Sequence, residues 1–169
     1  MNCSKNLIRK TQCRLKILRN KRDSIVRQLR EDITYLIKNG HQESAFSRIE
    51  QLYLDQNVKA VYDLLEYFCE FIVTNLFYIR RHRDCPNDIN EAVSSLLYAS
   101  ARCGDLPELI KLRKLFDERY GQNFAVTAVE LLDGNFVNAE VIEKFSVKSI
   151  PDDLKHKLLK EMATENGFN

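Results

Sequence analysis

The longest regular pattern in the chain is a series of apolar residues spaced three or four positions apart through residues 7–37. This spacing places side chains on one face of an α-helix. Asn39-Gly40 follows the series, and glycine adopts the left-handed conformation that commonly ends a helix. One helix over residues 7–37 is therefore predicted. Its predicted buried face comprises Leu7, Leu15, Leu18, Ile25 or Val26, Leu29, Ile33, Leu36 and Ile37.

A second apolar series runs from Gln42 to Arg80 and predicts an even longer helix. At 1.5 Å per residue, the two helices would be roughly 45 and 55 Å long. The short turn between them requires an antiparallel helical hairpin. Within residues 64–79 the few polar positions fall four apart and form one narrow stripe. A helix that is apolar on its other sides is normally buried by several neighbours, so later helices are expected to pack here.

The second half of the chain contains several shorter segments with helix start and stop signals. Asn87 or Asp88 is predicted to cap the third helix after Pro86, and Asn138 to cap a short later one. The third helix has a predicted buried side from Ile89 to Ala99, and the later predicted segments are 106–120, 123–133, 138–145 and 151–165.

Only five Gly and three Pro interrupt the 169 residues, which favours long helices over many short strands. The predicted fold is all-α, with shorter helices packed on a long antiparallel hairpin, in one domain spanning residues 1–169.

The net charge of +2 conceals a strong asymmetry, because residues 1–30 contain ten Lys or Arg and only one acid, Asp23. The rest of the chain is net acidic. A basic helix on an acidic body predicts contact with an anionic membrane, a nucleic acid or an acidic protein surface, although a solvated helix face would have the same composition. The predicted anionic-surface residues are Lys5, Arg9, Lys10, Arg14, Lys16, Arg19, Lys21 and Arg22.

Aromatic residues are absent from residues 1–34. Sites for single-stranded nucleic acid usually include aromatic side chains on which bases stack. Lipid or protein is therefore the favoured partner of the basic helix, and a helical adaptor that binds nucleic acid is the alternative.

Catalytic and cofactor motifs are missing from the sequence. The five glycines are isolated from one another, which excludes a glycine-rich phosphate loop, and no metalloprotease or EF-hand pattern occurs. Glu66 and Glu70 lie four residues apart, but a di-iron site would need Glu-x-x-His on partner helices. Cys69 in an apolar run is interpreted as a small buried hydrophobe. No catalytic residue, metal ligand or cofactor is predicted, and the chain is expected not to be an enzyme.

The five cysteines are scattered without a C-x-x-C pair, which is typical of reduced thiols in a cytosolic protein. The basic N-terminus lacks the apolar region of a secretory signal. The longest apolar stretch, residues 64–79, is too short to span a bilayer. A cytoplasmic location is therefore expected.

Several longer motifs resemble the increased-sodium-tolerance family of ESCRT-III-related proteins. They are residues 91–102 (EAVSSLLYASAR), 105–109 (DLPEL), 115–121 (LFDERYG), 137–138 and 142–147, with residues 66–69 a variant of a further family box. The amino-acid sequences of the second and third motifs most resemble those of the plant members. The resemblance extends over about residues 5–165.

This resemblance implies an ESCRT-III-like core that acts in endosomal, multivesicular-body sorting without catalysing a reaction. Family members bind a charged multivesicular body protein, an ESCRT-III subunit, and regulate the AAA+ ATPase that disassembles ESCRT-III filaments. The chain is accordingly expected to be recruited peripherally to endosomal membranes and to form homo- or hetero-polymers. Members usually carry a long C-terminal tail that docks on the ATPase, and this sequence ends at Asn169. Direct contact through such a tail is therefore not expected, unless the core itself makes the contact or the protein is longer.

A groove between the fourth and last predicted helices is the expected site for an amphipathic helix of the partner. The same apolar residues would also suit a plain hydrophobic core. The predicted partner-helix residues are Leu109, Leu112, Leu158, Leu159 and Met162.

Overall fold

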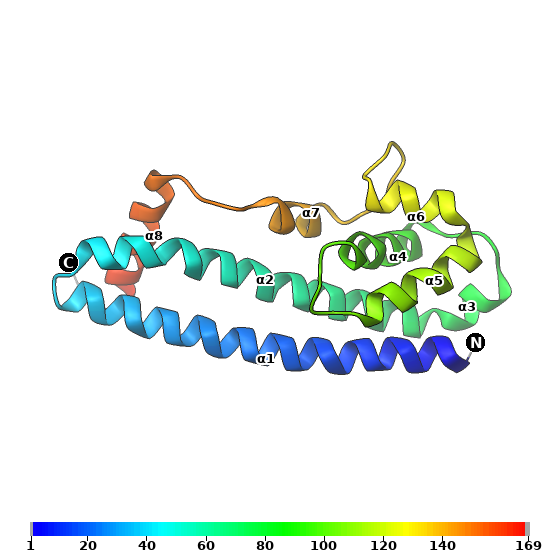
Figure 1. Cartoon of the computed structure of the whole chain (residues 1–169), viewed down its shortest axis with the longest axis horizontal. Helices are drawn as coiled ribbons and strands as arrows, with labels where there is room; N and C mark the ends of the chain where they lie inside the picture. Colours follow the sequence, from blue (N-terminus) through cyan, green and yellow to red (C-terminus); the bar gives the residue numbers. More distant parts are fainter. Residues whose placement is uncertain (1, 168–169) are drawn as a thin grey trace.

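The computed structural model describes residues 2–167 and contains only helices and loops within that range. Two long helices lie antiparallel, and shorter helices cover them from one side (Figure 1). This arrangement confirms the predicted all-α class. The helices are α1 (Asn2–Lys38), α2 (Gln42–Thr74), α3 (Leu76–Arg81), α4 (Asn87–Ser100), α5 (Glu108–Tyr120), α6 (Gln122–Val129), α7 (Ala139–Ser146) and α8 (Asp152–Glu165).

The turn of the hairpin is built on Gly40, as the sequence predicts. Gly40 has a φ of 76°, and its amide donates to the carbonyl of Ile37 at 3.2 Å. The amide of His41 donates to the carbonyl of Leu36 at 2.8 Å. These two bonds satisfy carbonyls that the end of α1 would otherwise leave open, and they turn the chain back toward α2.

The buried face of α1 is slightly rotated from the predicted one. Leu15, Val26 and Ile33 are buried as predicted, whereas Ile8 is buried at 1% exposure and Leu7 is only partly covered. Residues 8, 15, 26 and 33 fall on one line along the helix because their separations of 7, 11 and 7 are each close to whole turns. The apolar spacing alone did not distinguish neighbours such as Leu7 and Ile8.

The prediction of one helix from Gln42 to Arg80 was wrong at Asn75, where α2 ends and α3 begins. The Nδ2 atom of Asn75 donates to the carbonyl of Phe71 at 2.8 Å. Asparagine side chains compete in this way with the backbone bonding of a helix, and the residue has a φ of −104° and a ψ of 11°.

The starts of the shorter helices follow the predicted signals in part. Asn138 caps α7, since its side-chain oxygen accepts from the amide of Val141. The cap position of α4 is Pro86, so the prediction of Asn87 or Asp88 there was wrong. Proline favours the extended conformation that precedes the helix, and it has no backbone N–H that would need a hydrogen-bond acceptor. Likewise, α5 begins at Glu108, and the predicted start at Leu106 is a buried loop residue.

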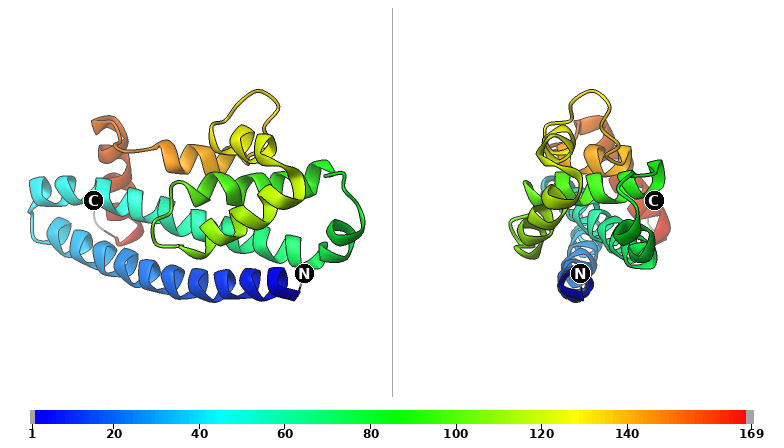
Figure 2. Two further views of the ribbon diagram at one scale, coloured as in Figure 1. Left: turned by 45° about the vertical axis from the view of Figure 1, so that its right-hand side comes forward. Right: turned by 90° about the vertical axis from the view of Figure 1, so that its right-hand side faces the viewer.

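Two separate hydrophobic clusters stabilise the molecule. The larger joins the N-terminal half of α1 and the C-terminal half of α2 to α4, α5, α6 and α7. The smaller lies near the hairpin turn, where α8 packs on α2 and α1. Figure 2 shows these as two ends of one elongated body, connected on the side opposite α1 by α7 and the extended segment before α8.

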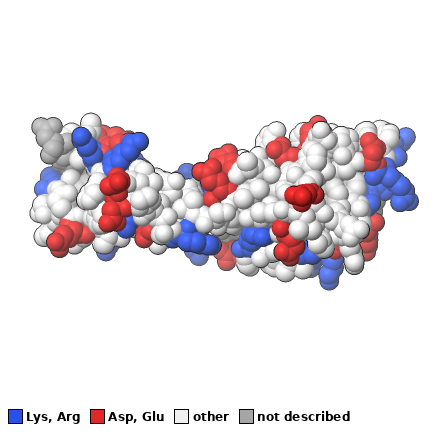
Figure 3. All heavy atoms as spheres, turned by 90° about the horizontal axis from the view of Figure 1, so that it is seen from above, with Lys and Arg blue, Asp and Glu red and all other residues white. Residues whose placement is uncertain are grey.

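The face opposite α1 has charges of both signs. Figure 3 shows acidic and basic side chains interspersed on this face, with basic ones also gathered at the narrow waist between the two ends. Among residues 2–167, no helix is long and apolar enough to cross a membrane.

Candidate partner-binding pocket and basic face

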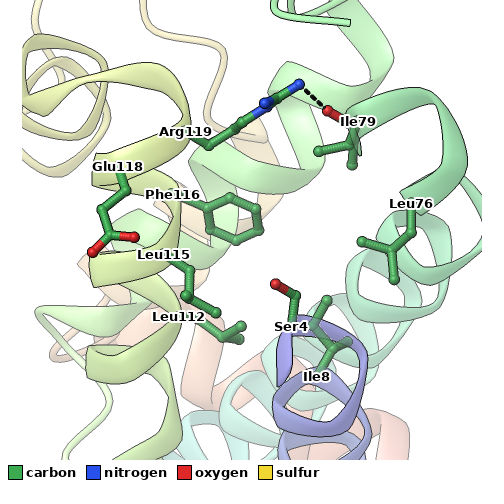
Figure 4. Close-up of a pocket in the computed structure, with 9 residues that line it drawn as sticks. All are labelled: Ser4, Ile8, Leu76, Ile79, Leu112, Leu115, Phe116, Glu118 and Arg119. Atoms are coloured by element: carbon green, nitrogen blue, oxygen red, sulfur yellow. Dashed lines mark hydrogen bonds between the residues drawn. The ribbon is translucent and has the colours of Figure 1, made fainter. Parts of the chain in front are cut away.

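An apolar pocket lies at the end of the hairpin farthest from its turn, between α1, α3 and α5. Its volume is about 210 Å³. Figure 4 shows side chains from the three helices directed toward a common space, with Ile8 on α1, Leu76 on α3 and Leu112 on α5. The lining residues are Ser4, Ile8, Leu76, Ile79, Leu112, Leu115, Phe116, Glu118 and Arg119.

The spacing of residues on α5 explains why this wall is apolar. Leu112, Leu115 and Phe116 are three and four residues apart, so they lie on one side of the helix. Leu112 and Phe116 are buried, while Leu115 is partly exposed at the pocket. The pocket can therefore accept an apolar side chain from outside without a change in the core behind it.

Arg119 fixes the distance between α5 and α3. Its guanidinium donates to the backbone carbonyls of Ile79 and His82, at the C-terminal end of α3 (Figure 4 draws the first of these bonds). The last carbonyls of a helix lack partners within the helix, and a cation is well suited to them. One side chain thus holds the two walls of the pocket together.

The structure overturns the prediction that the fourth and last predicted helices line a common groove. Leu109 and Leu112 belong to the larger cluster, whereas Leu158, Leu159 and Met162 belong to the cluster at the hairpin turn. Figures 1 and 2 place α5 and α8 toward opposite ends of the molecule. The two helices have similar apolar faces but pack on different parts of the hairpin, which their sequences did not reveal.

Of these five residues, only Leu112 lines the pocket between α1, α3 and α5. Leu158 and Met162 line a second, smaller pocket of about 60 Å³ between α8 and α2. The sequence interpretation missed Ile8 as a wall of the main pocket. It assigned Leu76 and Ile79 to the apolar face of the second helix without indicating that α1 and α5 would meet them there.

Among the predicted anionic-surface residues, the arginines form ion pairs within the described part of the chain and the lysines do not. All four arginines are held in ion pairs with carboxylates of other helices, at 2.8 Å for Arg9 with Glu70 and 2.6 Å for Arg22 with Asp55. The remaining pairs are Arg14 with Glu108 at 2.6 Å and Arg19 with Asp63 and Glu66 at 3.5 and 3.3 Å.

The four lysines of the set are exposed, and within residues 2–167 none of them forms an ion pair. Lys10 and Lys21 lie 11 residues apart, close to three full turns, so they share a face. Ile17, which is 68% exposed, lies on the same face between them. Lys5 and Lys16 are also 11 residues apart, but the helical rotation of 100° per residue places them about 120–140° around the helix from Lys10. Lys16 lines a pocket beside Glu66 and Glu70 of α2. The charge available to an external surface is therefore mainly that of the lysines.

The stripe of Glu66 and Glu70 on α2 faces α1. Hydrogen bonds from Gln12 and Arg9 hold the pKa of Glu70 below its ordinary value, which keeps the carboxylate charged.

Burial raises the pKa of the Cys69 thiol to about 12, so the reactive thiolate is disfavoured. Across the described part of the chain, no three His, Cys, Asp or Glu side chains come together as a metal site.

A family model described as "Ist1: Regulator of Vps4 activity in the MVB pathway" matches residues 5–169. The chain belongs to the Ist1 family. This confirms the resemblance to the increased-sodium-tolerance proteins that rests on the motifs between residues 91 and 147. The family is thus described as regulating the activity of another protein, Vps4.

Two relatives show how far the Ist1 family similarity extends. The chain is 25% identical over 150 residues to an IST1-like protein of Dictyostelium discoideum, covering 89% of this chain and 40% of the relative. It is 28% identical over 160 residues to the vacuolar protein sorting-associated protein IST1 of Saccharomyces cerevisiae, covering 89% of this chain and 52% of the relative. The chain spans about half the length of these relatives.

A solved structure shows that the Ist1 family fold is shared. The crystal structure of the S. cerevisiae Ist1 N-terminal domain in complex with a Did2 MIM motif superposes with a TM-score of 0.84 at 24% identity. The match covers 98% of this chain and 92% of that domain. The ESCRT-III-like architecture expected from the sequence is thereby confirmed.

Proposed function

We propose that this chain is a non-enzymatic binding core of the endosomal sorting machinery that holds an amphipathic helix of an ESCRT-III subunit. Through that contact it would regulate a Vps4-type AAA+ ATPase and be recruited peripherally to endosomes. The observation that carries the proposal is the apolar pocket between α1, α3 and α5. A groove between helices suits the apolar face of an incoming amphipathic helix.

Two features support this choice of site. The pocket is walled by three helices, and Arg119 connects two of them, α5 and α3, so its walls are held in place before any partner binds. The S. cerevisiae Ist1 domain with the same fold was crystallised with a short motif of another protein, Did2. Of the predicted partner-helix residues, we retain Leu112 as a wall of this pocket and Leu109 as its support from the core side.

The test uses fluorescence polarisation with a labelled C-terminal helix of an ESCRT-III subunit. Leu115→Glu places a charge in the pocket at a partly exposed position, and we expect at least tenfold weaker binding, a loss of about 1.4 kcal/mol. Ile110→Glu is the matched control, because Ile110 lies on the same helix, is 55% exposed and does not line the pocket. Equal binding by the wild type and Leu115→Glu, with both folded by circular dichroism, would reject the site.

We also propose that the unpaired lysines of α1 bind the chain to an anionic membrane surface. Each lysine near such a surface contributes on the order of 1 kcal/mol. Lys10 and Lys21, which share a face, would therefore contribute most of the attachment, and Lys5 and Lys16 would add to it from the side of the helix. The exposed apolar Ile17 lies between Lys10 and Lys21 and can enter the headgroup region with them. Polymers of the chain on that membrane belong to the same proposal.

Sedimentation with phosphatidylserine vesicles tests this second proposal. Substitution of Lys5, Lys10, Lys16 and Lys21 by Gln should abolish sedimentation, and added salt should weaken wild-type binding. Binding to RNA with a steep salt dependence, in the absence of vesicle binding, would instead favour a nucleic-acid surface.

A further inference from the structure

A third pocket, of about 270 Å³, lies on the side of the hairpin between its two ends. Four segments contribute to it: α1, α2, the loop between α4 and α5, and α7. Three cations line it, each from a different segment: Arg22 from α1, Arg102 from the loop and Lys144 from α7. Neither the predicted basic helix nor the partner-binding pocket includes Arg102 or Lys144.

Arg102 is held in place without a carboxylate partner. Its two terminal nitrogens donate to the carbonyls of Tyr98 and Val129, each at 3.0 Å, and its guanidinium carbon lies 3.7 Å from the centre of the Tyr98 ring. An arginine has five N–H donors, so these two bonds leave others unused. Within residues 2–167, no Asp or Glu forms an ion pair with Arg102. Its positive charge is therefore fixed in position and uncompensated.

The other two cations have carboxylate partners of different strength. Arg22 pairs with the buried Asp55 at 2.6 Å, and Lys144 lies 3.9 Å from Glu140 on its own helix, a weak contact because Glu140 is 54% exposed. Asp105 is the one carboxylate that lines the pocket, and it is exposed. Asp55 therefore neutralises Arg22, and the charge available to a ligand comes from Arg102 and from the weakly paired Lys144, beside the single lining carboxylate Asp105.

The rest of the lining suits an anion that is attached to a larger group. Tyr62 lines the pocket and contributes a hydroxyl that can donate a hydrogen bond; burial raises its pKa further above neutral pH. Val58 and Phe145 provide apolar surface beside the charges. At about 30 Å³ of liquid per water molecule, the pocket has room for roughly nine waters, which exceeds the size of one phosphate group.

We propose that the pocket formed by Arg22, Arg102, Tyr62 and Lys144 binds the phosphate group of a small phosphorylated molecule. Planar guanidinium groups match phosphate oxygens through paired N–H donors, and a lysine adds a mobile point charge. The phosphate would occupy the space among the three cations and supply the anion that Arg102 lacks. The carrier of the phosphate would lie against Val58 and Phe145. The site is independent of the partner-helix and membrane proposals.

Isothermal titration calorimetry of the full chain in phosphate-free buffer tests the proposal, with inorganic phosphate, adenosine monophosphate and adenosine as the probes. We expect the first two to bind and adenosine not to bind. If inorganic phosphate and adenosine monophosphate bind with equal affinity, the phosphate group accounts for all of the binding. If the monophosphate binds more tightly, the group that carries the phosphate also contributes. Adenosine binding as strong as that of its monophosphate would overturn the proposal.

Substitutions in the pocket lining then test whether the phosphate binds at this site. Lys144→Gln and Arg102→Gln should each weaken phosphate binding about tenfold, the effect of one lost charge-assisted hydrogen bond. Lys148→Gln, two residues beyond α7 and outside the pocket lining, is the control and should bind like the wild type. Because Arg102 also bonds to the backbone, Lys144→Gln keeps the test valid if Arg102→Gln does not fold. Unchanged binding by Lys144→Gln, or loss of binding by Lys10→Gln instead, would overturn the assignment.

Discussion

Arginines and lysines alternate along the first half of α1, yet they have different surroundings. Each arginine reaches a carboxylate on another helix, at distances of 2.6–3.5 Å. The lysines between them are exposed and unpaired within residues 2–167. The arginines are Arg9, Arg14, Arg19 and Arg22, and the lysines are Lys5, Lys10, Lys16 and Lys21.

This difference shows that the number of cations in a segment is a poor measure of the charge that it presents. A guanidinium has a planar set of donors that fits a carboxylate, and it sheds water more readily than an ammonium group does. Arginine is therefore suited to the partly buried contacts that hold α1 to the body. Lysine, which is strongly hydrated, is suited to the outer face.

The largest effect is expected at the most buried of these pairs. Arg22→Gln leaves Asp55, whose side chain is 4% exposed, without its cation. Because an unpaired buried charge is strongly unfavourable, the free energy of unfolding should fall by about 3 kcal/mol. Urea denaturation followed by circular dichroism measures this change. Lys21→Gln removes the neighbouring cation and should change stability by less than about 0.5 kcal/mol; equal losses would contradict the division.

A smaller effect is expected where α1 meets α5. The Nε atom of Arg14 donates to both carboxylate oxygens of Glu108, at 2.6 and 2.8 Å, and the arginine is 46% exposed. A double-mutant cycle with Arg14→Gln and Glu108→Gln should give a coupling free energy of about 0.5–1 kcal/mol. A coupling near zero would show that this pair does not contribute to the attachment of α5.

The contribution of the exposed Arg9–Glu70 ion pair to stability should be detected mainly through its dependence on pH. Since the pKa of Glu70 is lowered in the folded protein, its contribution is present above the ordinary Glu pKa and is lost as the pH falls through the lowered value. Glu70→Gln should therefore lower the urea midpoint slightly at neutral pH and have no effect in acid below that range. A Glu70→Gln penalty that persists unchanged into acid would show that the carboxylate charge is not its source.

The smallest effect is expected from exchanging the lysines for arginines. Substitution of Lys5, Lys10, Lys16 and Lys21 by Arg preserves the charge at exposed positions, so stability should change by less than about 0.5 kcal/mol. The reverse exchange, Arg to Lys at the four paired positions, should lower the melting temperature. Thermal denaturation of the two variants side by side compares them directly, and a larger loss from the first exchange would invert our interpretation.

The fold was predictable because its main signals are local. The turn at Gly40 and the cap at Asn138 depend on residues within a few positions of them. Apolar residues repeated every three or four positions over a long stretch identified both hairpin helices. The break at Asn75 was missed because asparagine interrupts a helix only through its own side-chain bond, which the apolar pattern does not show.

The sites were less predictable because they combine distant segments. Glu108 lies 94 residues from Arg14, so the sequence did not show that this cation is already paired. The same limit applies to the groove predicted between the fourth and last helices. Leu109 and Leu159 have similar apolar surroundings in sequence, and only packing places them in different clusters.

The attachment of α1 has a mechanical consequence. Three different helices hold this 37-residue rod at points along its length: α2 through Arg9, Arg19 and Arg22, α5 through Arg14, and α8 through Arg30, which pairs with Glu165. A load applied to its outer face is therefore shared among several joints and is not concentrated at one. Separation of α1 from the body would therefore require several ion pairs on three different helices to break together.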